Sequence, residues 1–276
     1  PSAKKFPRST LTRYVKNLYK KGKDSLQTFF FSFDGRVSLC CDIWSDHWQT
    51  HSYFGVTCHW IDNEWNIQKR LISYRVFDDN HNANNCFKML HHILQEYNLV
   101  HKIFSISLDN ASSNNVMVRD LENLCRPSLG GKFFHIRCAC HIFNLCTQDG
   151  IKALNSTLGP IKQALNLLWA RPKLLKEWKK FCKLNNMKPK RFPQDVQHRW
   201  NSTYELLKEA LPYKDLLCHF FASHDQTNNI MLQPYHWELV EKLDKLLECF
   251  NDATHLLSGV YYPTSHLLFL ECCNIS

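Results

Sequence analysis

The stretch VSLCCDIWS, residues 37–45, decides the fold, because an apolar strand here carries an acidic residue, Asp42, close to its end. A second stretch, IFSISLD, residues 103–109, has the same form, with Asp109 directly after a short apolar run. An unpaired carboxylate is expensive to bury, so an acid in a strongly apolar strand requires a reason. Two reasons are open from the residues alone. The acids either cap turns and helices, as Asp109 would do for the helix beyond it, or form a site.

Hydrophobic spacing around these two stretches gives the order of the elements. We predict helices over residues 9–31, 84–97 and 114–124, and strands over residues 37–44, 53–61, 65–77, 103–108 and 133–137. Asp62-Asn63 fits a hairpin turn between the second and third strands. From His141 the pattern is helical almost to the end, with a loop over residues 185–198.

Three meandering strands followed by alternating helices and strands is the order of the ribonuclease-H-like fold, although other α/β proteins share this count. We therefore predict an α/β protein in which a ribonuclease-H-like mixed sheet is followed by an all-helical region. The expected parts are a basic N-terminal helix over residues 1–33, the core over 34–150 and the helical region over 151–276.

The first and fourth strands are neighbours in such a sheet, so Asp42 and Asp109 would converge on one spot. Converging carboxylates bind hard divalent cations such as Mg²⁺ or Mn²⁺. Two such ions about 4 Å apart can activate a water molecule and stabilise the leaving oxygen of a phosphodiester. The pair therefore predicts metal-dependent phosphodiester chemistry, if the acids are not caps.

The net charge of +9 is concentrated in two blocks. Residues 4–23 contain eight basic residues and no acid, and residues 171–191 contain nine basic residues and one acid. Residues 201–276 have ten acids against four bases. Concentrated positive charge predicts a partner with a phosphate backbone, that is a nucleic acid, and a solvated helix face is the alternative. The predicted nucleic-acid contacts in the second block are Lys176, Lys179, Lys180 and Lys183.

The 13 cysteines are scattered, and the sequence contains no CxxC pair. Most lie in apolar stretches, which favours reduced thiols that act as small core side chains. Cys138 and His141 have the spacing of half a zinc site, but no second spaced pair accompanies them, so zinc is not expected. No run of about 18 apolar residues indicates a membrane span, so no membrane partner is expected.

Six blocks of the sequence, in order, resemble motifs of hAT-superfamily transposases, including plant proteins of the Ricesleeper and Daysleeper type. They span residues 37–264, and are LCCDIWS (39–45), YFGVTCHWID (53–62), DNASSN (109–114), CACHIFNL (138–145), DVQHRWNSTY (195–204) and LSGVYYPT (257–264). The departures are Cys41 before the first acid, Asp46-His47 after it, and His198 where the family often has Thr. None of these departures removes a metal ligand.

The resemblance implies that Asp42 and Asp109 are two of three metal-binding acids for cleavage and strand transfer, and that the helical region over residues 151–276 is the start of the family's insertion. The third acid, a Glu, and the zinc finger and dimerisation segments of the family are expected outside this chain, which would then be a central fragment. Weak Mg²⁺ or Mn²⁺ binding, a nuclear location and a homodimer formed through outside segments are expected with them. The resemblance also implies a DNA-facing His141 and an Arg199-Trp200 element.

Trp200 in that element would stack on a base swung out near the cleavage site, since base–aromatic stacking offsets the cost of unstacking a base. The alternative is that Trp200 begins an amphipathic helix with Tyr204 and Leu207 and belongs to the core. The function expected overall is a transposase core that binds DNA. Its rival is a domesticated module that keeps the fold for DNA or protein contacts without chemistry.

Overall fold

The computed structural model describes residues 7–45, 50–196, 199–224, 230–259 and 262–275, and they form two compact units that meet in sequence between Cys138 and Ala139. Asp46, His47 and His198, noted above as departures from the family motifs, lie outside the described residues. Helix α4, expected at the end of the core, belongs to the helical unit. Helical periodicity gives the extent of a helix but not the unit on which it packs.

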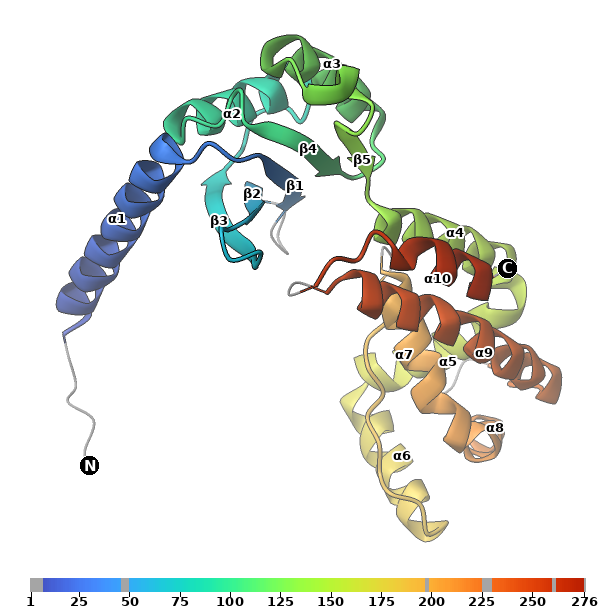
Figure 1. The fold of residues 1–276 in the computed structure, drawn as a ribbon. Helices are drawn as coiled ribbons and strands as arrows, with labels where there is room; N and C mark the ends of the chain where they lie inside the picture. Colours follow the sequence, from blue (N-terminus) through green and yellow to red (C-terminus); the bar gives the residue numbers. More distant parts are fainter. Residues whose placement is uncertain (1–6, 46–49, 197–198, 225–229, 260–261, 276) are drawn as a thin grey trace. The chain divides into compact units, whose positions relative to one another are not determined.

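The first unit holds a five-stranded sheet in the order β3-β2-β1-β4-β5 (Figure 1). Its elements are α1 (Arg8–Ser32), β1 (Val37–Ser45), β2 (Ser52–Ile61), β3 (Ile67–Val76), α2 (Ala83–Glu96), β4 (Ile103–Leu108), α3 (Ser112–Cys125) and β5 (His135–Arg137), with a short 3-10 turn at Ser128–Gly131. The pairs β1–β2 and β2–β3 are antiparallel, and β1–β4 and β4–β5 are parallel. This mixed sheet is the predicted one.

One face of the sheet carries the core of this unit. Alternate residues of β1, namely Val37, Leu39 and Cys41, are buried together with side chains of α2 and α3 such as Leu90 and Leu121. The residues between them on β1 point to the other face, because side chains alternate along a strand. That alternation places Asp42 on the face opposite the core, where it remains exposed.

The second unit is helical throughout its described part. Its helices are α4 (Ala139–Ala153), α5 (Asn155–Ala170), α6 (Pro172–Leu184), α7 (Trp200–Ala210), α8 (Lys214–Ser223), α9 (Pro234–Leu257) and α10 (Leu267–Ile275). Between α7 and α8 the helical path is interrupted by a 3-10 turn at Leu211–Tyr213, because Pro212 has no N–H for a continuous helix. The core of the helical unit contains Trp178 and Phe220, with ring centroids 5.3 Å apart.

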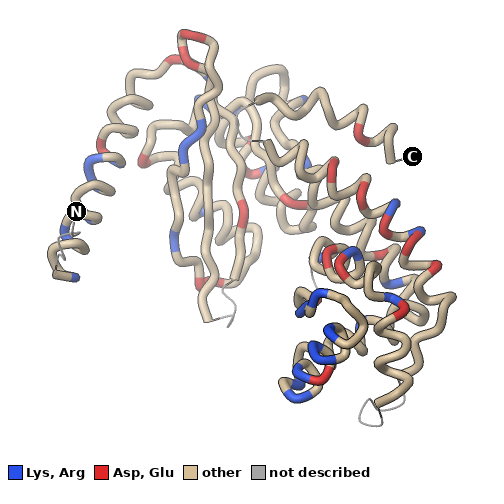
Figure 2. The backbone as a smooth tube through the Cα atoms, turned by 90° about the horizontal axis from the view of Figure 1, so that it is seen from below, with Lys and Arg blue, Asp and Glu red and all other residues tan. Residues whose placement is uncertain are grey.

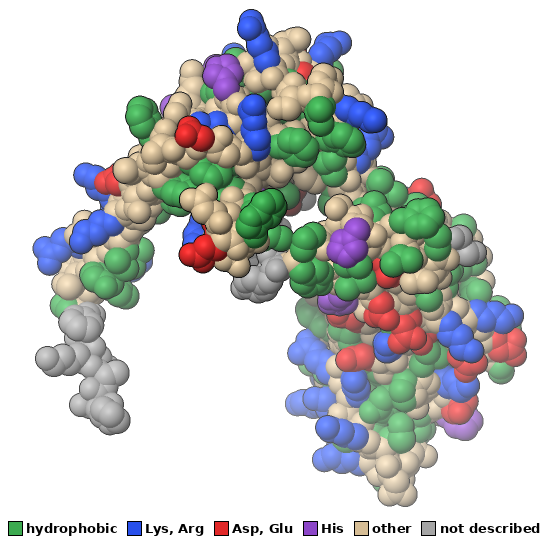
Figure 3. Space-filling view, in the orientation of Figure 1, with side chains coloured by type: hydrophobic (Ala, Val, Ile, Leu, Met, Phe, Trp, Pro, Cys, Tyr) green, Lys and Arg blue, Asp and Glu red, His purple; other side chains and the backbone are tan. Residues whose placement is uncertain are grey.

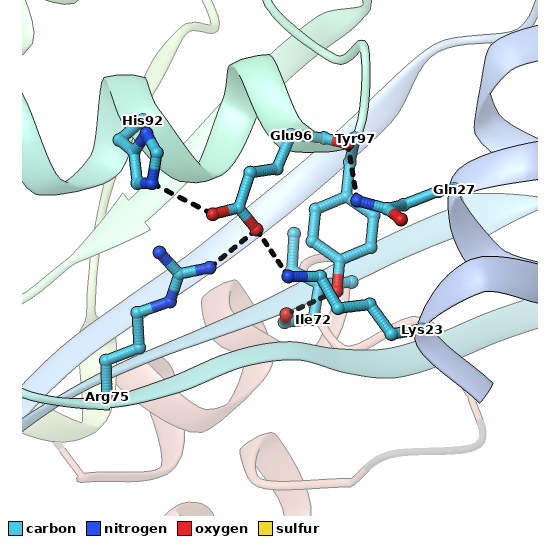
Figure 4. A network of polar contacts seen from close by, with 7 residues as sticks. All are labelled: Lys23, Gln27, Ile72, Arg75, His92, Glu96 and Tyr97. Carbon is cyan, nitrogen blue, oxygen red and sulfur yellow. Dashed lines mark hydrogen bonds and ion pairs between the residues drawn. The ribbon is translucent and has the colours of Figure 1, made fainter. Parts of the chain in front are cut away.

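Helix α1 is fixed to the first unit near its C-terminal end. Phe30 is fully buried in the sheet core, whereas the apolar side chains of its first half, such as Leu11 and Tyr19, are more than half exposed. Lys23 of α1 and Arg75 of β3 both bind the Glu96 carboxylate of α2, at 2.9 Å and 2.6 Å (Figure 4). The Glu96 side chain thus links α1, β3 and α2.

Glu96 has an unusual titration because of these two cations. Burial alone would raise its pKa, but the hydrogen bonds and charges of Arg75 and Lys23 lower the pKa to about 2, from an ordinary value of 4.5. A carboxyl whose pKa is depressed by folding stabilises the folded state above its unfolded pKa. This contribution is therefore complete above about pH 4.5 and is lost as the pH falls toward about 2.

Glu96→Gln is expected to lower the free energy of unfolding at pH 7 by roughly 1–3 kcal/mol, the usual range for hydrogen bonds to a charged group. The lower end is more realistic, because both cations keep about a quarter of their side-chain surface exposed (26%). Urea denaturation followed by circular dichroism measures the difference. The difference in the free energy of unfolding between wild type and variant should shrink between pH 4.5 and pH 3. A difference that does not depend on pH would contradict the ion-pair argument. Glu64→Gln, on an exposed turn, is the control.

Candidate metal centre and nucleic-acid interface

The two predicted acids lie at matching positions on neighbouring parallel strands. Cys40 of β1 pairs with Ser107 of β4, and Asp42 and Asp109 each follow two residues later. Asp42 is on β1 and Asp109 is the first residue after β4, so both acids lie at the same end of two parallel strands that are roughly 4.8 Å apart. The predicted pairing of the first and fourth strands as neighbours is confirmed.

Local bonds orient both carboxylates. Asp42 accepts a hydrogen bond from the Ile43 amide at 3.0 Å. Asp109 accepts from the Ala111 amide at 3.1 Å and from the Asn114 side chain, while Asn114 also donates to the Asp109 carbonyl at 3.2 Å. Asp109 thus closes the turn that leads into α3, without being its N-cap, which is Ala111. The capping alternative is therefore partly correct for Asp109, and the turn fixes its carboxylate at the end of β4.

Both acids line one cavity of about 200 Å³. Its walls are apolar side chains from the sheet and helices, including Phe54 and Met117, together with His81 and Asn114. His81 lies in the loop between β3 and α2, where its ring stacks on Phe77 with centroids 5.4 Å apart. Sequence reasoning missed His81, because a histidine in a loop gives no periodic signal.

Negative charge from the acids reaches the cavity wall. Burial raises the pKa of the Cys86 thiol, and the charge of Asp109 raises it further. Burial also raises the pKa of Cys41 well above its usual range, with added contributions from its neighbours Cys40 and Asp42. Both cysteines line the cavity. The charges of Asp109 and Asp42 thus act on this edge of the cavity, although burial is the larger cause of both pKa shifts.

The donor set at this edge fits Mg²⁺ or Mn²⁺, which take carboxylate oxygens and complete their coordination with water or phosphate oxygens. One or two protein carboxylates are usual for Mg²⁺ at phosphate-handling sites. Across the described ranges, no cluster of three His, Cys, Asp or Glu side chains has the geometry to hold a metal ion. The two acids can therefore contribute only part of a coordination shell.

The four predicted lysines lie on one exposed face of α6. Lys176, Lys179, Lys180 and Lys183 are all exposed, whereas Leu174, Trp178 and Cys182 form the buried stripe of the same helix. Figure 2 shows this run of blue positions with a single red one, and Figure 3 shows the side chains along one edge of the helical unit. None of the ion pairs found among the described residues involves any of the four. Their charge is thus open to a partner.

The structure corrects the stacking role expected of Trp200. Its side chain is only 3% exposed and packs against Tyr204 and Phe250, with ring centroids 6.2 Å and 6.4 Å away. A ring enclosed in this way cannot stack on a base in this structure, so the alternative of a core residue holds. Arg199, the residue before it, is exposed, and its carbonyl accepts from the Ser202 hydroxyl at 2.7 Å.

His141 and Cys138 lie where β5 leads into α4. The Cys138 amide donates to the Leu108 carbonyl at 2.9 Å, which extends the β4–β5 pairing by one residue. His141 is half-buried in the first turn of α4. Five of the cysteines are buried, as expected of small core side chains: Cys41, Cys58, Cys86, Cys125 and Cys182. No helix in the described ranges is both long and apolar enough to cross a membrane.

Comparison with protein families assigns both units. Residues 40–132 match the model of the ZBED1 RNase-like domain, and residues 136–246 match that of the ZBED1 RNase-like helical domain. The two matches follow each other along the chain as the sheet unit and the helical unit do. The ribonuclease-like fold and the helical region predicted from the sequence are confirmed.

Curated relatives are similar over nearly the whole chain. The "Putative AC transposase" of Zea mays is 35% identical over 97% of this chain and 34% of its own length. The "Zinc finger BED domain-containing protein RICESLEEPER 2" of Oryza sativa subsp. japonica is 30% identical over 95% of this chain and 37% of its own length. DAYSLEEPER of Arabidopsis thaliana is 22% identical over 92% of this chain. The chain spans about a third of the length of the relatives it matches.

Proposed function

Because this chain belongs to the hAT family of transposase-like proteins, with an RNase-like domain followed by its helical domain, we propose that it is a transposase core that binds DNA. In this proposal Asp42 and Asp109 hold Mg²⁺ or Mn²⁺ at a phosphodiester. The single observation that carries it is the placement of both acids at the same end of adjacent parallel strands, where they line a shared cavity.

The metal ions would supply Lewis-acid chemistry to the phosphodiester when bound. The protein's part is to hold its carboxylates in place and to grip the DNA backbone. Asn114 and the Ala111 amide fix the Asp109 carboxylate. The exposed α6 lysines and Arg199 bind phosphates, and His141 faces the DNA. We also propose a nuclear location and a homodimer formed through segments outside this chain.

Metal binding gives the direct test. We expect weak, saturable binding of Mn²⁺, measured by isothermal titration calorimetry or by the loss of free Mn²⁺ signal in electron paramagnetic resonance. Asp42→Asn or Asp109→Asn should abolish it, because removing one carboxylate leaves a single hard ligand. Asp149→Asn changes an exposed acid of the helical unit and is the matched control. Equal Mn²⁺ binding by all four proteins would contradict the proposal.

Cleavage is expected to require more than these two acids. Mobile waters replace a missing carboxylate poorly in a two-metal site, so this chain alone should not nick labelled duplex DNA appreciably. A nicking assay with and without Asp109→Asn measures this. Robust nicking by the chain that depends on Asp109 would show that one of its own acids is the third ligand.

A domesticated module is the second candidate. The exposed, unpaired lysines of α6 favour it, since they bind DNA backbone with or without chemistry. Retained DNA binding in the absence of any Asp42- and Asp109-dependent metal binding would identify this second function.

A further inference from the structure

Three aromatic side chains form a cluster on the sheet face opposite the core. Trp44 of β1 and Tyr74 of β3 have ring centroids 5.2 Å apart, and Tyr53 of β2 stacks on Tyr74 at 5.1 Å with an angle of 9° between the rings. Trp44 is 39% exposed and Tyr74 is 51% exposed. Tyr53 is half-buried between them. Three adjoining aromatic rings, two of them exposed, leave apolar ring surface open to a partner on this face.

The backbone register fixes this cluster. Trp44 pairs directly with Tyr53, and Gly55 pairs with both Asp42 and Tyr74, so all of them share one face. Gly55 makes room for the indole: a Cβ atom there would lie 2.7 Å from the outer ring of Trp44. The Trp44 ring therefore lies over Gly55 of β2 and contacts Tyr74 of β3.

The cluster lies next to the two acids. Trp44 follows Asp42 by two residues on the same strand and the same face, a distance of roughly 7 Å along the strand. Toward Asp109 the same face carries small polar side chains, Ser105 and Ser107, rather than more apolar surface. A chain of nucleotides with one phosphate at the acids has a base within reach of the aromatic rings.

We propose that Trp44, Tyr53 and Tyr74 form a stacking platform for an unpaired base of DNA beside the phosphate held at Asp42 and Asp109. The inference rests on the proposed function and deepens it by naming single-stranded DNA as the form that is bound at the site. Aromatic faces stack on any base, and this stacking is tolerant of sequence. The platform thus takes the role that the buried Trp200 cannot fill in this structure.

The charge around the platform makes the binding depend on a cation. Asp42 adjoins the rings, and a phosphate placed beside it is repelled unless a divalent ion lies between them. Single-stranded DNA should therefore bind more tightly when Mg²⁺ or Mn²⁺ is present, and this gain should disappear in Asp42→Asn.

Fluorescence anisotropy of labelled single-stranded oligonucleotides tests the platform. Trp44→Ala is expected to weaken binding roughly 5- to 150-fold, the range for losing one stacked base. Trp44→Phe keeps a ring and should restore most of the affinity. Trp65→Ala removes a tryptophan that is 85% exposed at the β2–β3 turn, away from the cluster, and should bind as the wild type does. Thermal melts confirm that each variant is folded.

An oligonucleotide with abasic sites distinguishes affinity that comes from base stacking from affinity that comes from phosphate charge. It keeps every phosphate, so Trp44→Ala and wild type should bind it equally. Gly55→Ala should weaken binding to the base-containing strand, because the added methyl displaces the Trp44 ring. If Trp44→Ala leaves the affinity for base-containing DNA unchanged, the platform is overturned while the proposed function stands. If the wild type binds neither oligonucleotide nor duplex, the proposed function fails and the platform with it.

Discussion

Reversing the charge of the four exposed lysines of α6 is expected to weaken binding to duplex DNA by roughly 100-fold or more at 0.1 M salt. The four substitutions are Lys176→Glu, Lys179→Glu, Lys180→Glu and Lys183→Glu. Each lysine that neutralises a phosphate releases a counterion, and the logarithm of the affinity falls with the logarithm of salt by about 0.9 per contact. Losing four contacts should therefore flatten the salt slope by roughly 3–4. A gel-shift titration at several salt concentrations measures both quantities.

A matched variant distinguishes the contribution of the α6 face to DNA affinity from that of the net charge of the protein. It carries the same change in charge at exposed lysines spread over both units, Lys88, Lys132, Lys152 and Lys242, each replaced by Glu. This variant should lose less affinity and keep most of its salt slope, because its lysines do not share one surface. Equal losses in the two variants would show that only the total charge matters. Unchanged binding in the α6 variant would make these lysines a solvated helix face.

Trp200→Ala is expected to lower the free energy of unfolding by about 3–5 kcal/mol, the usual cost of removing a buried tryptophan. The side chain is 3% exposed and contacts the rings of Tyr204 and Phe250, so its loss leaves a cavity in the helical core. Urea denaturation monitored by circular dichroism measures the change.

Two further substitutions make this test specific. Arg199→Ala, at the exposed position before it, should change stability by no more than about 0.5 kcal/mol and should lower the affinity for DNA. Trp65→Ala, at an exposed turn, should also leave stability almost unchanged. A folded and fully stable Trp200→Ala that has lost DNA binding would restore the stacking role that this structure does not allow.

The strands and the two acids could be predicted because their signals are local. An apolar run ending in an acid is visible at residues 37–45 and 103–109, and the order of the elements then pairs the two strands. Register follows from the same alternation, since a slip of one residue would turn Asp42 into the core. The resemblance added the family, which the matches at residues 40–132 and 136–246 confirm.

The features that the sequence misassigned or did not reveal depend on packing between residues that are distant in sequence. A tryptophan at the first position of an amphipathic helix gives no sign of which side it faces, and only the contact of Trp200 with Phe250 settles it. In the sequence Glu96 has the pattern of an ordinary surface acid, because its partner Lys23 is 73 residues earlier in the chain. The aromatic cluster likewise depends on three separate strands and on the space above Gly55.

The strand order also determines when the acids meet during folding. Strands β1, β2 and β3 follow one another closely in the sequence and form early, because closing a short loop costs little entropy. Strand β4 returns to β1 only after α2, and the hydrogen bond from Ser105 to Ser38 joins residues 67 positions apart. Asp42 and Asp109 share this separation, so their site assembles late. A nascent chain therefore displays the open edge of β1 before it has any metal-binding pair.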